Sequence, residues 1–285
     1  MIPFNESAEH LARRLQKEKT TSTREREDNL SGCLGSFRVG SPPYLNTVPL
    51  IRGLEKEIIF APPSQLAAML QRDELDAALI SVTEPLLHDR YDILDGIAIA
   101  SLGEVKSILL AHRRPLAEMR KVYCDTASLA SFNLLRVLLA EKGIHPEYKA
   151  LTNYDPAALP DYAMLIGDQA LDFLLGPHEH EIWDLGVAWY ELTNLPCVHA
   201  VWALRRGIDT KPLRFILREA KDFGLETLDY IINSRKEYTL EFRKDYLGWH
   251  IHYYLCSDEK RGLARLGELM TKHGLGPVYE PRYVT

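Results

Sequence analysis

The turn at residues 41–47, SPPYLNT, places three polar side chains where a strand leads into a helix. Tyr44, Asn46 and Thr47 would lie at the carboxyl end of that strand, where open α/β sheets bind their ligands. The Asn46 amide offers an acceptor and two donors without carrying a charge, so it suits a ligand hydroxyl. The alternative is that Asn46 or Thr47 caps the helix, and residue type alone favours capping.

Two further segments carry polar groups at positions where a strand ends. Residues 125–131, DTASLAS, bring Thr126 and Ser128 to the start of a predicted helix, where hydroxyls and free amides can bind an anion. The same side chains can cap that helix, and the two roles are compatible. Asp168 ends the buried run 163–168. It can orient a loop or a ligand hydroxyl, and a structural role in a turn is an equal alternative.

The histidine pairs His178/His180 and His250/His252 look at first like metal ligands. Residues two apart share a face only on a strand, whereas the first pair follows Gly-Pro in an expected loop and the second falls in an expected helix. A catalytic zinc also needs a third ligand at suitable spacing. The sequence contains no GxGxxG, no Walker loop and no GxSxG elbow. We therefore expect neither a metal nor an organic cofactor.

The elements that must position these residues alternate over the first part of the chain. Apolar runs at 37–40, 58–61 and 74–82 predict three strands, and helical patterns at 50–56 and 65–73 separate them. The third run is apolar enough to be buried on both faces, as in a parallel sheet. This βαβαβ order predicts an α/β fold with ligands at the carboxyl ends of the strands.

The rest of the chain predicts a second α/β unit followed by helices. Further strands are expected at 93–101, 105–112, 121–125, 147–151, 163–168 and 197–205. Helical patterns are expected at 132–142, 212–232 and 246–255.

This order of elements predicts two lobes with a ligand cleft between them. Lobe one would comprise residues 37–110 and 203–285, and lobe two residues 111–202. The strands at 105–112 and 197–205 would cross from one lobe to the other.

Composition narrows the classes of partner. The 285 residues include 34 Lys and Arg against 40 Asp and Glu, which gives a net charge of −6. A mildly acidic chain without a basic block is a poor partner for nucleic acid or anionic lipid. No apolar run approaches the roughly 20 residues of a membrane helix, and the start lacks the apolar stretch of a secretory signal. We expect a cytoplasmic protein that binds a small molecule, with its oligomeric state left open.

Residues 1–36 differ from the rest of the chain. Between Glu6 and Asp28 there are six basic and six acidic residues, with almost no large apolar residue after Leu15. Such composition favours a polar, flexible extension. A docking helix for a partner is the less favoured alternative, because its apolar face is thin.

Six segments, in this order, resemble the chorismate dehydratase family, which acts first in the futalosine route to menaquinone. The resemblance covers roughly residues 37–285. The segments are RVGSPPYLNTVPLIRGL (38–54), SQLAAMLQRDELDAALISVTEPL (64–86), GIAIASLGEVKSILL (96–110), CDTASLASFNLLRVLL (124–139), AMLIGDQAL (163–171) and DLGVAWYELTNLPCVHAVWA (184–203).

The resemblance implies a two-lobed, type II periplasmic-binding-protein-like fold and the removal of water from chorismate to give 3-[(1-carboxyvinyl)oxy]benzoate. It places the family's catalytic Asn on Asn46 and its catalytic Ser on Ser107. It implies that Tyr44, Thr47, Thr126, Ser128 and Asp168 serve substrate binding, without a cofactor. Two departures from the family pattern are Glu104, where Pro is common, and the stretch 81–85.

Two other functions remain open. A solute-binding or sensor domain of the same fold would bind its ligand without converting it. A later enzyme of the same route, dihydroxynaphthoate synthase, shares the fold, but the chain lacks its Ser-Pro-Cys-Pro-Asn turn. Fold alone does not decide between these functions.

Overall fold

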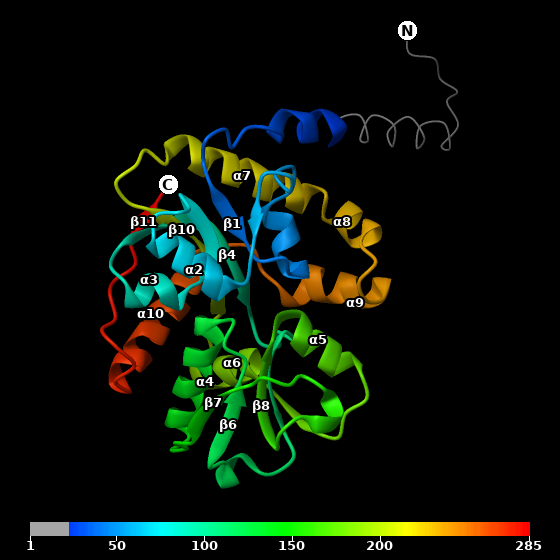
Figure 1. Ribbon diagram of the computed structural model, residues 1–285, viewed down its shortest axis with the longest axis vertical. Coiled ribbons are helices and arrows are strands. Elements are labelled where there is room, and N and C mark those ends of the chain that lie inside the picture. Colours follow the sequence, from blue (N-terminus) through cyan, green and yellow to red (C-terminus); the bar gives the residue numbers. More distant parts are fainter. Residues whose placement is uncertain (1–22) are drawn as a thin grey trace.

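The computed structural model describes residues 23–285 and contains two β-sheets, each with helices around it (Figure 1). The first sheet has the strand order β11-β4-β10-β3-β1-β2. Its strands are β1 (Val39–Ser41), β2 (Ile59–Phe60), β3 (Ala77–Ser81), β4 (Tyr91–Ser101), β10 (Cys197–Arg205) and β11 (Tyr283–Val284). Strand β1 lies parallel to both β2 and β3, as the predicted βαβαβ order requires.

The second sheet has the order β7-β6-β8-β5-β9. Its strands are β5 (Ile108–His112), β6 (Lys121–Cys124), β7 (Glu147–Ala150), β8 (Tyr162–Ile166) and β9 (Glu181–Asp184). Strand β6 is parallel to β7 and β8, while β5 is antiparallel to β8 and β9. We call the first sheet with its helices the first lobe, and the second sheet with its helices the second lobe.

The chain passes between the sheets in two short segments outside any strand, residues 102–107 and 194–196. The prediction that the strands at 105–112 and 197–205 cross between lobes is wrong, because β5 pairs within the second sheet and β10 within the first. Residues 108–110 therefore lie with the second lobe, and residues 197–202 with the first. An apolar run predicts a strand, but partners far along the chain decide which sheet it joins.

Helices surround both sheets (Figure 1). Around the first lobe are a helix over 23–30, η1 (Leu45–Leu50), α2 (Pro63–Gln71), α3 (Thr83–Leu87), α7 (Lys211–Glu226), α8 (Leu228–Ser234), α9 (Leu240–Asp245), η4 (Tyr246–His250) and α10 (Ser257–Lys272). Around the second are η2 (Leu116–Glu118), α4 (Leu129–Glu141), η3 (Pro156–Ala158), α5 (Gly167–Leu175) and α6 (Leu185–Thr193).

Three predicted helices differ in form. The segment expected to be helical at 50–56 is preceded by the 3-10 helix η1, which contains Pro49, and continues as turns. The helix expected over 212–232 is broken between α7 and α8 at Thr227. The helix expected over 246–255 is only the π turn η4. After it, His252 exchanges two backbone hydrogen bonds with Ala100 (2.7 and 2.9 Å), so the chain is extended there.

A close approach between α7 and η1 fixes the turn that carries Asn46. A Cβ atom on Gly224 would lie 1.9 Å from the carbonyl oxygen of Pro49, so only glycine fits at this point of α7. The two backbones can therefore touch. This contact sets the position of η1 against the first sheet.

The part of the predicted extension 1–36 that the structure describes packs against the first lobe, although its composition predicts too little apolar surface for that. The exposed fractions of Leu30 and Leu34 are 7% and 2%, and both belong to the main apolar core. Arg26 forms ion pairs with Glu219 and Glu226 of α7, beside which this segment runs (Figure 1). Two well-placed leucines suffice for docking, although the segment's average composition is polar. Residues 1–22, which the same prediction covers, lie outside the described residues.

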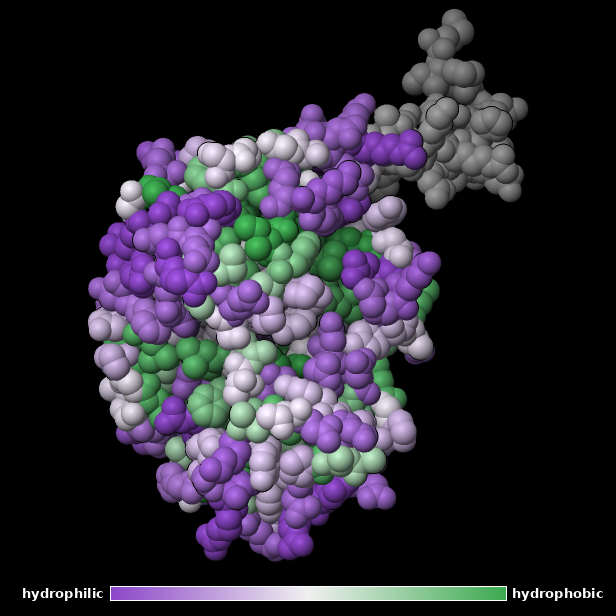
Figure 2. Space-filling view, in the orientation of Figure 1, coloured by the Kyte–Doolittle hydropathy of each residue, from purple (hydrophilic) through white to green (hydrophobic). Residues whose placement is uncertain are grey.

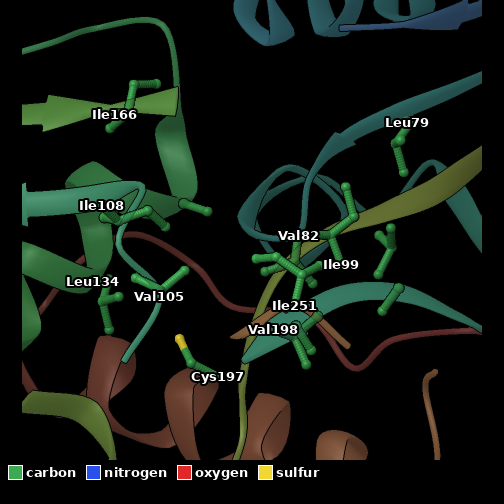
Figure 3. Packing of buried hydrophobic residues seen from close by; sticks show 14 of the residues in the cluster. Leu79, Val82, Ile99, Val105, Ile108, Leu134, Ile166, Cys197, Val198 and Ile251 are labelled. Carbon is green, nitrogen blue, oxygen red and sulfur yellow. The ribbon is translucent and has the colours of Figure 1, made fainter. Parts of the chain in front are cut away.

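The main apolar core is continuous across the two lobes. It contains Trp202 and Val198 of the first lobe, Leu134 of the second, and Val105 of the linking segment. Figure 3 shows Val105 beside Leu134, with Cys197 of β10 nearby. Hydrophilic side chains cover the far end of the second lobe in Figure 2, and hydrophobic ones show where the lobes meet. The lobes are therefore packed together near the linkers.

Candidate active site

A cavity lined by residues of both lobes and of the linker lies between the two lobes. Its apolar wall includes Leu79, Ile99 and Ile251 on the first-lobe side, with Ile108 and Ile166 on the second-lobe side (Figure 3). Its polar lining is Tyr44, Asn46, Thr47, Ser81, Ser107, Ser128, Ser131 and His199. The cavity is thus a mostly apolar pocket with a few convergent polar groups.

Five of the seven site residues predicted from the sequence line this cavity. They are Tyr44, Asn46, Thr47, Ser107 and Ser128, and they come from both lobes and the linker. Thr126 is exposed and lines a neighbouring hollow between α2 and α4. Asp168 follows Gly167 of the cavity wall but does not line the cavity, and its carboxylate accepts a hydrogen bond from the Leu45 backbone.

Asn46 and Ser107 meet at a third residue, Tyr246. The Asn46 amide nitrogen donates to the Tyr246 hydroxyl at 3.0 Å. The Ser107 side chain interacts with the same phenol, and its hydroxyl lies 3.4 Å from the Val105 carbonyl oxygen. The two candidate catalytic groups, one on η1 and the other on the linker, therefore meet at the same side chain.

The capping alternative is confirmed for Ser128 but not for Thr47, because no side chain caps η1. The Thr47 hydroxyl lies 2.8 Å from the carbonyl oxygens of both Pro42 and Tyr44, so it holds the turn before η1 together. Ser128 is the N-cap of α4, where its hydroxyl accepts from the backbone and the hydroxyl of Ser131. Both hydroxyls line the cavity while performing these structural tasks.

The linker that carries Ser107 is held by Asp184. This buried carboxylate accepts hydrogen bonds from the backbone amides of Val105 and Lys106, the shortest at 2.8 Å. It also caps α6 by accepting from the amides of residues 186 and 187. Burial raises the pKa of Asp184, and these four backbone hydrogen bonds oppose the rise. Lys106 has a positive φ of 61°, which is unfavourable for a residue with a side chain. The linker conformation therefore depends on the hydrogen bonds to Asp184.

A second contact fixes Ser107 to the second lobe. Its carbonyl oxygen accepts from the Gly167 amide at 2.8 Å. Gly167 has a φ of +55°, and a Cβ there would lie 3.2 Å from the Tyr44 ring. Glycine suits this backbone, because a side chain here would be strained and would crowd the Tyr44 ring. Tyr44, Gly167 and Ser107 thus bring the edges of both lobes together at the cavity.

Among the described residues that line the cavity, none is charged at neutral pH. Burial lowers the pKa of His199 to about 4, and its Nε2 atom lies 2.9 Å from the Ser101 hydroxyl, so the ring is neutral. Burial, with Asp125 and Asp168 nearby, raises the pKa of Tyr44 to about 12. The helices α2, α4 and α5 begin at this cavity, at Pro63, Leu129 and Gly167. Their N-terminal dipoles favour an anionic ligand without a cationic side chain.

The sequence did not single out Tyr246, His199 or Ser131. The first is separated by 200 residues from the asparagine it binds, and no local pattern marks it. His199 lies in a buried strand, where an ordinary core histidine would look the same. Ser131 lies within the segment 125–131, whose hydroxyl-rich composition indicated a possible anion site.

Within residues 23–285, no group of three His, Cys, Asp or Glu side chains could hold a metal ion. His178 and His180 bind backbone carbonyls, and His250 lies against Asp245 and a carbonyl of the linker. None of the helices in that described range is both long and apolar enough to span a bilayer.

Comparisons with known proteins bear on this site and fold. A model of the family described as Menaquinone biosynthesis matches residues 37–272. A chorismate dehydratase of Thermus thermophilus is 31% identical over 257 residues, which cover 82% of this chain and 95% of that protein.

Among solved structures, a protein of Archaeoglobus fulgidus matches with a TM-score of 0.67 at 19% identity, covering 84% of this chain and 98% of that chain. The periplasmic aliphatic sulphonate binding protein of Escherichia coli matches with a TM-score of 0.55 at 16% identity, covering 87% and 93%. These likenesses show the fold alone and confirm the predicted periplasmic-binding-protein-like α/β architecture. By its match over residues 37–272 and its curated relative, the chain belongs to the menaquinone biosynthesis family.

Proposed function

We propose that this protein is a chorismate dehydratase, which eliminates water from chorismate to give 3-[(1-carboxyvinyl)oxy]benzoate. The observation that carries the proposal is the meeting of Asn46 and Ser107 at one phenol on the edge of an uncharged cavity. Membership of the menaquinone biosynthesis family and the dehydratase relative support it.

The reaction needs positioning more than a strong base. A ring proton and the neighbouring hydroxyl leave together as water, and the ring becomes aromatic, so the elimination is strongly downhill. Asn46 and Ser107 hold the leaving hydroxyl and orient the ring. Catalysis then comes from preorganised hydrogen bonds in a mostly apolar cavity.

The ring proton passes to a carboxylate of the substrate itself, and that carboxyl group then gives a proton to the departing hydroxyl, so that water leaves overall. Of the described residues that line the cavity, His199 is the most basic by type, but its pKa of about 4 and its contact with Ser101 make it a poor base. Tyr44 keeps its proton, because burial raises its pKa to about 12. A carboxylate of chorismate is no stronger a base than His199, but it belongs to the substrate and can lie beside the ring proton, so proximity favours it.

The two substrate carboxylates bind to neutral groups. Hydroxyls of Ser128 and Ser131 and the first amides of α4 face the cavity from the second lobe. The start of α2 at Pro63 faces it from the first lobe. Partial positive charge at helix starts stabilises anions without the cost of burying a cation. Such a site suits a dianion that must be released after the reaction.

The test is to incubate the purified protein with chorismate and to analyse the mixture by mass spectrometry. We expect a product lighter than chorismate by one water, with the ultraviolet spectrum of a benzoate. Binding of chorismate without conversion would reject the enzyme and favour a solute-binding or sensor domain. Absence of both binding and conversion would reject chorismate as the ligand.

A further inference from the structure

We infer that Tyr246 is a positioning residue. It fixes the orientation of the Asn46 amide and the position of the Ser107 hydroxyl at the edge of the cavity. The inference rests on the proposed function, because it assigns Tyr246 a part in the same reaction. Tyr246 does not line the cavity, and its side chain is only 1% exposed. It therefore acts through the two residues that it holds and not by touching the substrate.

The hydrogen bond to Tyr246 fixes which way the Asn46 amide faces. A phenol oxygen can accept from an N–H group, so the Asn46 Nδ2 atom, 3.0 Å away, takes the Tyr246 side. The Asn46 carbonyl oxygen and the second N–H then remain for a ligand. Without the phenol, the amide could rotate and present a donor where the leaving hydroxyl needs an acceptor, or the reverse.

Tyr246 stays a neutral phenol in the folded protein. Burial is the largest cause of its raised pKa, and the hydrogen bonds from Ser107 and Asn46 oppose the rise. A neutral phenol both donates and accepts hydrogen bonds. Its oxygen can therefore accept from Asn46 while its O–H remains a donor, and a phenylalanine offers neither group.

The phenol ring is itself held rigidly. It stacks on Phe242, with ring centroids 5.6 Å apart and an interplanar angle of 15°. Its backbone begins the π turn η4, closed by a hydrogen bond from the Ile251 amide to the Tyr246 carbonyl at 3.1 Å. Single π turns are rare and often lie at functional sites. Here the turn places the Tyr246 hydroxyl within hydrogen-bonding distance of the Asn46 amide.

Charged contacts tie the same turn to the linker that carries Ser107. Asp245, just before Tyr246, accepts from the Lys106 ammonium at 2.6 Å and lies 3.1 Å from His250. His250 in turn lies 3.0 Å from the Glu104 carbonyl oxygen. The residues on both sides of Tyr246 are thus attached to Glu104 and Lys106, which precede Ser107 on the linker. These contacts fix the turn against the linker.

Tyr253 provides a matched control on the same stretch of chain. It is buried like Tyr246, at 3% exposure, but its hydroxyl has no hydrogen-bond partner among the described residues. Tyr253→Phe removes a buried hydroxyl without touching the network. Tyr246→Phe removes one that joins two candidate catalytic groups.

The kinetic experiment compares these two variants on chorismate. We expect Tyr246→Phe to lower kcat by about tenfold or more with little change in KM, as misplacement of reacting groups does. Tyr253→Phe should keep the parental kcat. Added to Ser107→Ala, the Tyr246→Phe change should lower kcat little further. A Tyr246→Phe protein with parental kcat, or one whose loss adds in full to that of Ser107→Ala, overturns the inference.

A second measurement keeps the inference testable apart from activity. In the parental protein, NMR should show one of the two Asn46 side-chain amide protons strongly protected from exchange with solvent. That protection should be lost in Tyr246→Phe and kept in Tyr253→Phe. Rapid exchange of both protons in the parental protein overturns the inference even if chorismate is converted. A protected proton in a protein that does not convert chorismate rejects the proposed function alone.

Discussion

At the scale of the residue, the site depends on neutral groups held by ionised ones outside it. Asn46, Ser107 and Tyr246 form the uncharged centre. The carboxylates of Asp184 and Asp168 hold the backbone beside that centre without entering the cavity. Because both carboxylates lie outside the cavity, an anionic ligand in the cavity does not face them.

Asp168 should make stability depend on pH. Burial, with Asp172 and Glu237 as further causes, raises its pKa from 3.8 to about 6. Ionisation is therefore harder in the folded state, and the protein loses stability as pH rises from about 4 through 6. Asp168→Asn, which can still accept from the Leu45 amide, should raise the free energy of unfolding at pH 8 by on the order of 2 kcal/mol.

Urea unfolding of the Asp168→Asn and parental proteins at several pH values checks this. The gain should shrink as the pH falls towards 4, where the carboxyl group is neutral in both states. Asp161→Asn, at an exposed position, is the control and should change little. An equal gain from Asp168→Asn at pH 8 and pH 4 would count against the raised pKa.

Sequence reasoning reached the residues that share a local pattern and missed those joined by distant packing. Tyr44, Asn46 and Thr47 lie in the one turn that follows β1, and all three line the cavity. Ser107 and Ser128 came through the family resemblance and the hydroxyl-rich segment 125–131. Tyr246 could not be found in this way, because nothing near it in the chain reports its contact with η1. The roles of the predicted residues remain predictions.

At the scale of the element, the linker and the helix α6 form one mechanical unit. Asp184 connects the amides of residues 105 and 106 to the start of α6. Four backbone donors share this one carboxylate. Loss of one of its oxygens would leave a buried donor unpaired, which is costly.

Asp184→Asn should therefore weaken both folding and turnover. The new amide NH₂ would face backbone N–H donors, and we expect a loss of about 2–3 kcal/mol in the free energy of unfolding. Ser107 should also lose its position, so turnover of chorismate should fall while the protein remains folded. Thermal unfolding and kinetics check this. Asp155→Asn is the control, because Asp155 caps only the exposed η3. Parental stability and turnover in Asp184→Asn would contradict this role.

The segment before β1 should also contribute to stability. Leu34 is 2% exposed and packs in the main core, so Leu34→Ala should cost about 2–4 kcal/mol in the free energy of unfolding. Cys33→Ala, at the exposed neighbouring position, should change little. Chemical denaturation of both variants is the measurement. Equal stability of Leu34→Ala and the parental protein would show that the packing of this segment contributes nothing to the stability of the fold.

The order of strands and helices could largely be read from apolar periodicity, because burial imposes it locally. The sheet that each strand joins could not. Strand β5 was expected to cross between lobes, yet all of its pairing is with β8 and β9. Helix ends near Thr227 and His250 were also missed, since packing against β4 and η1 overrides helix propensity there.

At the scale of the whole molecule, the lobes are joined by two short linkers and a shared apolar core. On the outside, Glu141 of α4 pairs with Lys272 and His273 at the end of α10. These contacts hold one side of the interface closed. Any opening of the cavity should therefore occur on the side away from them.

Ligand binding should make the particle more compact. Two lobes around a central cavity can close when a ligand bridges them, and the shared core limits the motion to a rotation about the linkers. Small-angle scattering with saturating 3-[(1-carboxyvinyl)oxy]benzoate should show a smaller radius of gyration than without it. Sodium chloride at matched ionic strength is the control. An unchanged profile at saturation would reject closure but leave the reaction possible.

The central claim is that Asn46 and Ser107 together dehydrate chorismate, and turnover of their variants tests it most directly. Asn46→Ala and Ser107→Ala should each lower kcat by about 10²-fold or more, because each removes a preorganised hydrogen bond to the leaving hydroxyl. The kcat of the double variant should be only slightly lower than that of the less active single variant. All three variants should keep the unfolding curve of the parental protein. A folded Asn46→Ala protein that dehydrates chorismate at the parental rate would contradict the account.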